Sequence, residues 1–209
     1  MTIFTTTIKS VLVASVAALL FTGCTQQPRY VDSQHPESAK ASTMGLDYQD
    51  FRKASIEASQ SMLRSGALNR PGGGRYVLAI STIINDTTQR IDMDQLIKSI
   101  RMSLLQSGKV VVTTAVRAGG AEDNMSYDAR KLRNSEEFNQ KTVAKKGQMI
   151  APDFSLSGKI IQRNAKLSDG DMKVDYYIQL TLTDIKTGLA YWEGETVITK
   201  AGSGKTVNW

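Results

Sequence analysis

The sequence predicts one α/β (α+β) domain in which a mixed, mostly antiparallel sheet of about four to five strands is flanked by helices. Two observations lead to this fold class. The first part of the domain contains two segments with apolar residues at helical spacing, and its last third alternates apolar and polar residues with a period of two. The length of 209 residues suits a single domain with appended segments, which we place at 1–23, 24–45 and 46–209.

The first segment, residues 1–23, has the pattern of a secretory signal peptide. One basic residue, Lys9, precedes an apolar run from Val11 to Phe21, and no acidic residue occurs before Asp32. This run is about half as long as a membrane-spanning helix requires. We therefore expect residues 1–23 to be removed after export.

The end of the signal resembles a bacterial lipobox. Thr22-Gly23-Cys24 follows an apolar stretch, although Phe21 stands where a lipobox usually has Leu. In such signals the cysteine thiol receives diacylglycerol, and the acyl chains anchor the protein in a membrane. Cys24 is the single cysteine of the chain, so we expect it to be lipidated. The alternative is an ordinary secretory signal with a chance cysteine.

The second segment, 24–45, predicts a disordered linker behind the lipidated cysteine. It is polar, contains two prolines and lacks hydrophobic periodicity. Fully extended, it would reach roughly 70 Å. Residue 25 is Thr and not Asp, which by resemblance to enterobacterial sorting signals indicates the outer membrane.

The domain begins with a helix–strand–helix–strand pattern. Asp47 can cap a helix that runs to about residue 65, and a β-branched strand follows at 75–83. Asp92 can begin a second helix, which ends at Gly108 before a strand at 109–116. The apolar stripes of the two helices are Phe51, Ala54, Ala58 and Met62, and Met93, Ile97, Ile100 and Leu104.

A polar connection, 117–148, separates these elements from the last third of the domain. It has few apolar anchors, and Ser135 can cap a helix that runs to about Lys146. We interpret this segment as a solvated excursion or as a docking surface.

The last third predicts an antiparallel meander with strands at 153–167, 172–184 and 189–200. Asp169-Gly170 is typical of the hairpin turn between the first two strands. The middle strand alternates most regularly, and its apolar residues are Val174, Tyr176, Ile178, Leu180 and Leu182.

The composition excludes several kinds of chemistry. His35 and Cys24 are the single histidine and cysteine, and both precede the domain, so a disulfide, a Cys/His zinc site and a histidine-based triad are excluded there. Asp169 and Asp171 lack the other ligands of a calcium loop. The net charge of +6 is spread along the chain and does not indicate a nucleic-acid site. We expect no catalytic residue, metal or cofactor.

The chain ends in AGSGKTVNW, which resembles part of a phosphate-binding loop. Such a loop requires Gly five residues before its Gly-Lys pair, and Thr199 stands at that position. The loop must also open a helix, but only three residues follow Thr206. We therefore expect no nucleotide, and we interpret the stretch as a Gly/Ser tail that ends in Trp209.

The candidate partner-binding residues lie on the last two strands. Glu193 and Glu195 share one face because they are two residues apart. Trp192 and its neighbour Tyr191 alternate, so we expect one in the core and the other exposed as a possible interface anchor. Tyr177 lies on the polar face of its strand. A carboxylate-based hydrolase using Glu193 and Glu195 is the enzymatic alternative.

Several motifs together resemble the LpoB-type penicillin-binding-protein activators over nearly the whole chain after residue 23. In order, they are the lipobox, the linker, Ile84-Asn85-Asp86-Thr87 at a strand end, Ile91-Asp92 at a helix start, Leu105-x-Ser107-Gly108-Lys109, and Leu180-Thr181-Leu182-x-Asp184-x-x-Thr187-Gly188 followed by Trp192. The resemblance implies a fold similar to the N-terminal domain of TolB.

The resemblance also implies a function. Such lipoproteins are anchored in the outer membrane, face the periplasm and dock on a regulatory domain of a bifunctional, class A penicillin-binding protein, where they stimulate peptidoglycan synthesis without being enzymes. The linker is short for this family, which puts the identity of the synthase in doubt. The alternative is a structural or adaptor lipoprotein of another cell-envelope complex.

Overall fold

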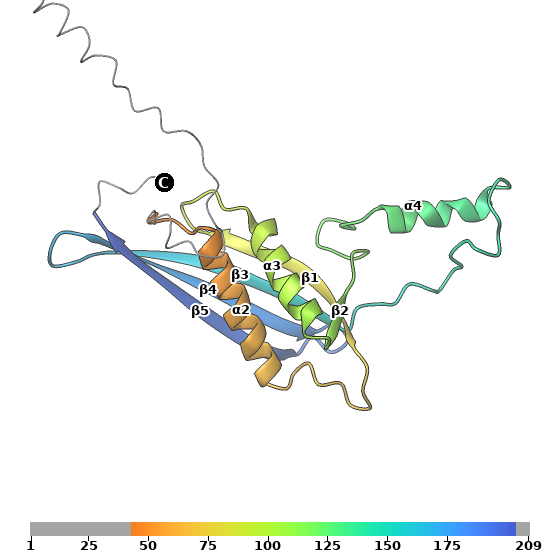
Figure 1. Cartoon of the computed structure of the whole chain (residues 1–209), viewed down its shortest axis with the longest axis horizontal. Coiled ribbons are helices and arrows are strands. Elements are labelled where there is room, and N and C mark those ends of the chain that lie inside the picture. The colour runs from red at the N-terminus through yellow and green to blue at the C-terminus, as the bar shows by residue number, and fades with distance from the viewer. Residues whose placement is uncertain (1–42, 204–209) are drawn as a thin grey trace, which may run out of the picture. The chain divides into compact units, whose positions relative to one another are not determined.

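The computed structural model describes residues 43–203 (Figure 1). The predicted signal peptide, Cys24, most of the predicted linker and residues 204–209 with Trp209 lie outside the described residues. The two longer helices of the described part are α2 (Tyr48–Arg64) and α3 (Met93–Gln106). Its strands are β1 (Tyr76–Asp86), β2 (Val110–Val112), β3 (Phe154–Lys166), β4 (Met172–Asp184) and β5 (Ala190–Gly202).

The strands form one mixed sheet in the order β2-β1-β3-β4-β5. β1 is parallel to β2 and β3, whereas β4 is antiparallel to both of its neighbours. The pairing of β3 with β4 runs without a shift from Phe154↔Asp184 to Lys166↔Met172. The α+β fold with a mixed sheet flanked by helices is therefore confirmed, and so is the C-terminal meander.

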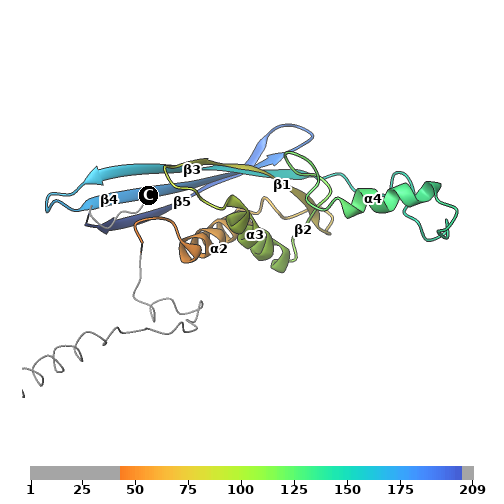
Figure 2. The same cartoon turned by 90° about the horizontal axis from the view of Figure 1, so that it is seen from above.

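Helices α2 and α3 pack on the same face of the sheet (Figure 2). Their predicted apolar residues are buried with the alternating residues of β4, except that Met93 is only partly buried. Burial of these side chains supplies most of the folding free energy, at roughly 25 cal/mol per Å² of apolar surface. The alternation of β4 is confirmed, because Val174, Tyr176, Ile178, Leu180 and Leu182 are all at most 2% exposed.

Helix α2 begins with two reciprocal side-chain caps. The Asp47 carboxylate accepts hydrogen bonds from the amides of Gln49 at 2.8 Å and Asp50 at 3.1 Å. The Asp50 carboxylate accepts the Asp47 amide at 2.9 Å. This capping box satisfies amides that have no acceptor within the helix.

Two predictions for the connection between the two parts of the domain were wrong. The strand expected at 109–116 pairs over only three residues, Val110–Val112, against Tyr76–Leu78. No helix forms at 135–146; helix α4 (Met125–Lys131) and the 3-10 turn η2 (Leu132–Asn134) precede that stretch instead. Neither α4 nor η2 buries a residue, so no apolar stripe in the sequence could reveal their position.

Candidate functional site

Within residues 43–203, no helix covers the second face of strands β3, β4 and β5 (Figure 2). Tyr177, Glu193 and Glu195 lie on this open face. Tyr177 is half-buried, and both glutamates are exposed. The structure thus brings together three of the four partner-binding candidates on two adjacent strands, where Tyr177 is paired with Val197 and Gln179 with Glu195.

The two glutamates border a shallow hollow on the open face. Its volume is about 390 Å³, and Gln179, Thr181, Glu193 and Glu195 contribute to its lining. The Gln179 amide donates to Glu195 Oε2 at 2.8 Å, and the Thr181 hydroxyl donates to Glu193 Oε1 at 3.4 Å. Each carboxylate therefore keeps acceptor capacity for the donors of another molecule.

Other carboxylates of this face already have cationic partners. Lys159 Nζ lies 2.7 Å from Asp86, and Lys173 Nζ lies 2.9 Å from Asp175. The pKa of Asp86 is lowered by the hydrogen bond from Lys159, and that of Asp175 by the hydrogen bonds from Thr199 and then Lys173. Within residues 43–203, neither Glu193 nor Glu195 forms such an ion pair. The negative charge of these two residues is therefore less compensated than that of Asp86 and Asp175.

Trp192 lies on the covered face and not with the other candidates. It is 7% exposed, and its indole nitrogen donates to the Ser61 hydroxyl of α2 at 3.4 Å. Its ring fills the space beside Gly194, where an added Cβ would lie 2.3 Å from Trp192 Cζ2. Trp192 therefore packs the sheet against α2.

Tyr191 is the exposed member of the aromatic pair, at 50%. The register of β4 on β5 shifts between Leu182↔Trp192 and Thr183↔Ala190, so Tyr191 is an extra residue in a bulge. Its ring lies 5.2 Å from that of Phe154, edge to face. The expectation of one buried and one exposed aromatic residue is confirmed.

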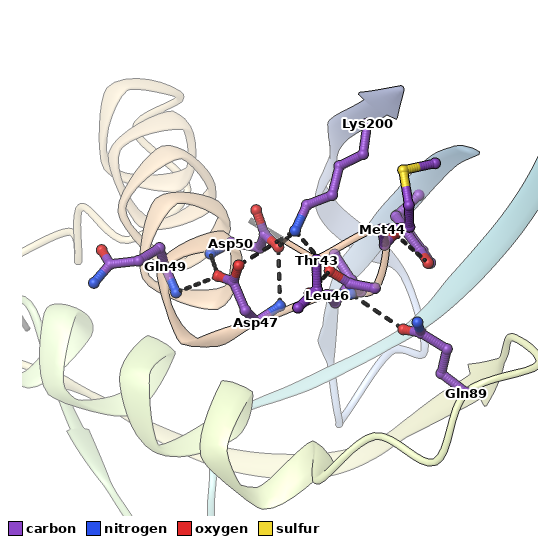
Figure 3. Close-up of polar contacts among 10 residues, drawn as sticks. Thr43, Met44, Leu46, Asp47, Gln49, Asp50, Gln89 and Lys200 are labelled. Carbon is purple, nitrogen blue, oxygen red and sulfur yellow. Dashed lines mark hydrogen bonds and ion pairs between the residues drawn. The ribbon is translucent and has the colours of Figure 1, made fainter. Parts of the chain in front are cut away.

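The entry of the chain into the domain is held by a cluster that the sequence analysis missed (Figure 3). Lys200 Nζ lies 2.5 Å from Asp50 Oδ2 and 3.3 Å from Asp47 Oδ2, and it donates to the Gly45 carbonyl at 2.6 Å. Its side chain is 13% exposed. We call these four residues the entry clasp. A lysine in the apolar alternation of β5 is the signal that could have indicated it.

Two further contacts hold the segment before α2. The Tyr176 hydroxyl donates to the Met44 carbonyl at 3.1 Å. The Leu46 amide donates to Gln89 Oε1 at 3.1 Å (Figure 3). Burial, and then the charge of Asp50, raise the pKa of Tyr176 to about 12. Met44 and Gly45, which the sequence analysis assigned to the linker, are buried against the domain.

The excursion between β2 and β3, residues 113–153, is tied to α3 at its base. Arg101, which is 8% exposed, forms a two-pronged ion pair with Glu122, and Arg117 pairs with Asp94. The pKa of Glu122 is lowered mainly by its hydrogen bond from Arg101. The remainder of the excursion, with α4, extends away from the sheet in both views (Figures 1 and 2).

Residues 43–203 contain no cluster of three or more His, Cys, Asp or Glu side chains that could bind a metal ion. In the same residues, no helix has both the length and the apolar character needed to cross a membrane.

The family model described as the peptidoglycan-synthase activator LpoB matches residues 50–198. Among curated proteins, no sequence match is found. The LpoB C-terminal domain from Escherichia coli is 13% identical with a TM-score of 0.42, over 72% of this chain and 99% of that one.

Two other solved structures are also similar. Lipoprotein GNA1162 from Neisseria meningitidis is 13% identical with a TM-score of 0.32, over 64% of this chain and 87% of that one. The PelC dodecamer from Paraburkholderia phytofirmans is 18% identical with a TM-score of 0.30, over 62% and 73%. Because the family match spans most of the domain, this chain belongs to the LpoB family of peptidoglycan-synthase activators.

Proposed function

We propose that this protein is an outer-membrane lipoprotein, facing the periplasm, that binds and activates a class A penicillin-binding protein in peptidoglycan synthesis. The observation that carries the proposal is the family match over residues 50–198. The family is one of regulatory activators, and we infer that the chain acts by binding and not by catalysis. The anchor would be the acylated Cys24.

The docking surface that we propose is the open face of β3, β4 and β5. The covered face is occupied by α2 and α3, whereas the open face presents Tyr177 with the exposed Glu193 and Glu195 (Figure 2). The two carboxylates have neutral hydrogen-bond partners and spare acceptor capacity. They are therefore suited to arginine or lysine side chains of the synthase, with Tyr177 adding aromatic contact area.

The test is a glycan polymerisation assay with a class A synthase of the same organism, with and without the full chain. We expect stimulation by the wild type and a loss of about tenfold or more in apparent affinity for Glu193→Gln/Glu195→Gln, since charge-assisted hydrogen bonds are each worth about 1.5–3 kcal/mol. Gln keeps an acceptor oxygen, so the side-chain contacts of the sheet are largely preserved.

The matched control is Glu136→Gln/Glu137→Gln, which removes the same charge from two exposed neighbours in the excursion. This control is expected to stimulate like the wild type. No stimulation of any class A synthase by the wild type would contradict the proposed function, whereas equal loss in both double variants would contradict only the docking face.

The proposed anchor has its own test, because Cys24 and the docking face act separately. The Cys24→Ala variant is expected to be lost from the outer-membrane fraction but still to stimulate the synthase in solution. Recovery of this variant in the outer membrane at the wild-type level would contradict anchoring through Cys24.

A further inference from the structure

A second hollow lies within the excursion, and basic side chains surround it. Its volume is about 650 Å³, which is within the roughly 300–1,000 Å³ of small-molecule sites. Five cationic residues contribute to its lining, and no Asp or Glu does: Arg130, Lys131, Arg133, Lys145 and Lys146. We call it the basic hollow. It is separate from the open face of the sheet.

Within residues 43–203, four of these five charges are not neutralised by a carboxylate. Lys131 pairs with Asp128 at 2.7 Å, but no ion pair of the described residues involves the other four. The guanidinium of Arg130 donates to the Ser126 carbonyl, and Arg133 Nε donates to the Arg130 carbonyl at 2.9 Å. These bonds orient both arginines and leave their charge available.

The two lysines that line the same hollow come from a later part of the excursion. Lys145 and Lys146 follow the arginines by more than ten positions, and the chain between them reverses direction to place both pairs on one hollow. The Lys145 amide is fixed by Gln148 Oε1 at 2.8 Å, whereas both lysine side chains are exposed. Like charges repel, and an anion bound between these cations would relieve that repulsion.

The arrangement and number of the cations around the hollow indicate which class of anion it would bind. A single carboxylate brings one negative charge, which cannot compensate four cations. A nucleic acid strand requires a groove of cations that follows its backbone, whereas these cations surround one hollow. A phosphate or diphosphate group brings more charge and matches the planar donors of arginine. Tyr127 and Met149 add less polar wall for whatever the phosphate is attached to.

We propose that the basic hollow binds a phosphate-bearing group of about the size of a diphosphate, held by Arg130, Arg133, Lys145 and Lys146. The phosphate could come from a free or sugar-linked diphosphate or from the headgroup of an anionic lipid, and the chemistry of recognition is the same. The inference goes beyond the proposed docking on a synthase and does not depend on it.

The experiment is calorimetric titration of the full chain, in non-ionic detergent, with two soluble probes. Inorganic pyrophosphate represents the diphosphate, and bis(glycerophospho)glycerol represents a lipid headgroup with two phosphates and without its acyl chains. We expect saturable binding of pyrophosphate. Tighter binding of bis(glycerophospho)glycerol than of pyrophosphate would support phosphate recognition and assign it to a lipid source.

The test variant is Lys145→Gln/Lys146→Gln, and the matched control is Lys166→Gln/Lys186→Gln. Each removes two exposed lysine charges, but only the first pair lines the hollow. We expect affinity to fall by about tenfold or more in the test variant, since it loses two charge-assisted contacts, and by less than about twofold in the control. Unfolding midpoints of both variants are expected to match the wild type.

Two results would overturn the proposal. One is no saturable binding of either probe by the wild type. The other is an equal loss of affinity in both double variants, which would show that the probes respond to overall charge and not to the basic hollow.

Discussion

The entry clasp supports a quantitative prediction for Lys200→Met. The change keeps a side chain of similar length and removes the ammonium, which uses its three donors on Gly45, Asp47 and Asp50. The two carboxylates that remain would still accept backbone amides at the start of α2, where the helix dipole favours negative charge.

The magnitude follows from burial. Removing one partner of a buried ion pair costs about 3–5 kcal/mol, and the clasp is nearly buried, since Lys200 is 13% and Asp50 14% exposed. Because the remaining carboxylates keep partners, we expect a loss at or just below the lower limit of this range, about 2–3 kcal/mol. For a domain of this size that corresponds to a fall in Tm of roughly 5–10 °C.

The assay is thermal unfolding followed by circular dichroism at pH 7, with Lys173→Met as the matched control. Lys173 pairs with Asp175 at 2.9 Å, but the Lys173 side chain is 38% exposed, and Asp175, at 13%, keeps the hydrogen bond from the Thr199 hydroxyl at 2.6 Å. We therefore expect the control to lose less than about 1 kcal/mol. A double-mutant cycle of Lys200→Met with Asp50→Asn is expected to show coupling of about 1–3 kcal/mol. Equal losses for Lys200→Met and Lys173→Met, or no coupling in the cycle, would refute the reasoning.

Three more predictions concern buried contacts. Gly194→Ala places a Cβ 2.3 Å from the Trp192 ring, so the free energy of unfolding in urea should fall by about 1–3 kcal/mol; an unchanged midpoint would contradict this. The pKa of Tyr176 is raised to about 12 from 10.0, so the contribution of Tyr176 to the free energy of unfolding should be fully present below pH 10 and be lost as pH rises towards 12. The stability advantage of the wild type over Tyr176→Phe should therefore shrink over that range. A constant difference between the two proteins would contradict this prediction. Glu122→Gln leaves the nearly buried Arg101 without its carboxylate, so the hydrogen-exchange protection factors of residues 113–153 should fall about fivefold or more. Because the pKa of Glu122 is lowered, the wild type should lose the same protection, relative to the intrinsic exchange rate at each pH, as pH falls through that pKa. Unchanged protection factors in both cases would exclude the anchoring role.

Elements with strong local periodicity were predicted well from the sequence. The expected strand at 172–184 coincides with β4, and the helix predicted from Asp47 to about residue 65 coincides with α2 and its caps. Each of these elements has a continuous apolar stripe. The residues that indicate the element in the sequence are the same residues that are buried in the core.

Elements without an apolar stripe were predicted poorly. The sequence has β-branched residues on both sides of Val112. The chain nevertheless separates from β1 after Val112, so β2 ends there. In the excursion the polar sequence is compatible with a helix at several positions. Helix α4 forms where no stripe and no side-chain cap mark it, so local propensity alone could not select its position.

The candidate site was predicted in part for the same reason. The shared face of Glu193 and Glu195 follows from the period of a strand and required no tertiary information. The bulge at Tyr191 and the room that Gly194 gives to Trp192 depend on how β5 meets β4 and α2, so the burial of Trp192 could not be predicted from residue order.

The sequence by itself determined which residues of each helix and strand form the apolar side, because a periodic pattern is a local property of the chain. It also contained the motifs that indicate the family. Only the tertiary structure decided which residues meet across the domain: Lys200 reaches Asp47 and Asp50 because β5 ends beside the start of α2, and the basic hollow exists because the excursion folds back on itself. Contacts between charges far apart in sequence depend on chain reversal, and no local pattern encodes them.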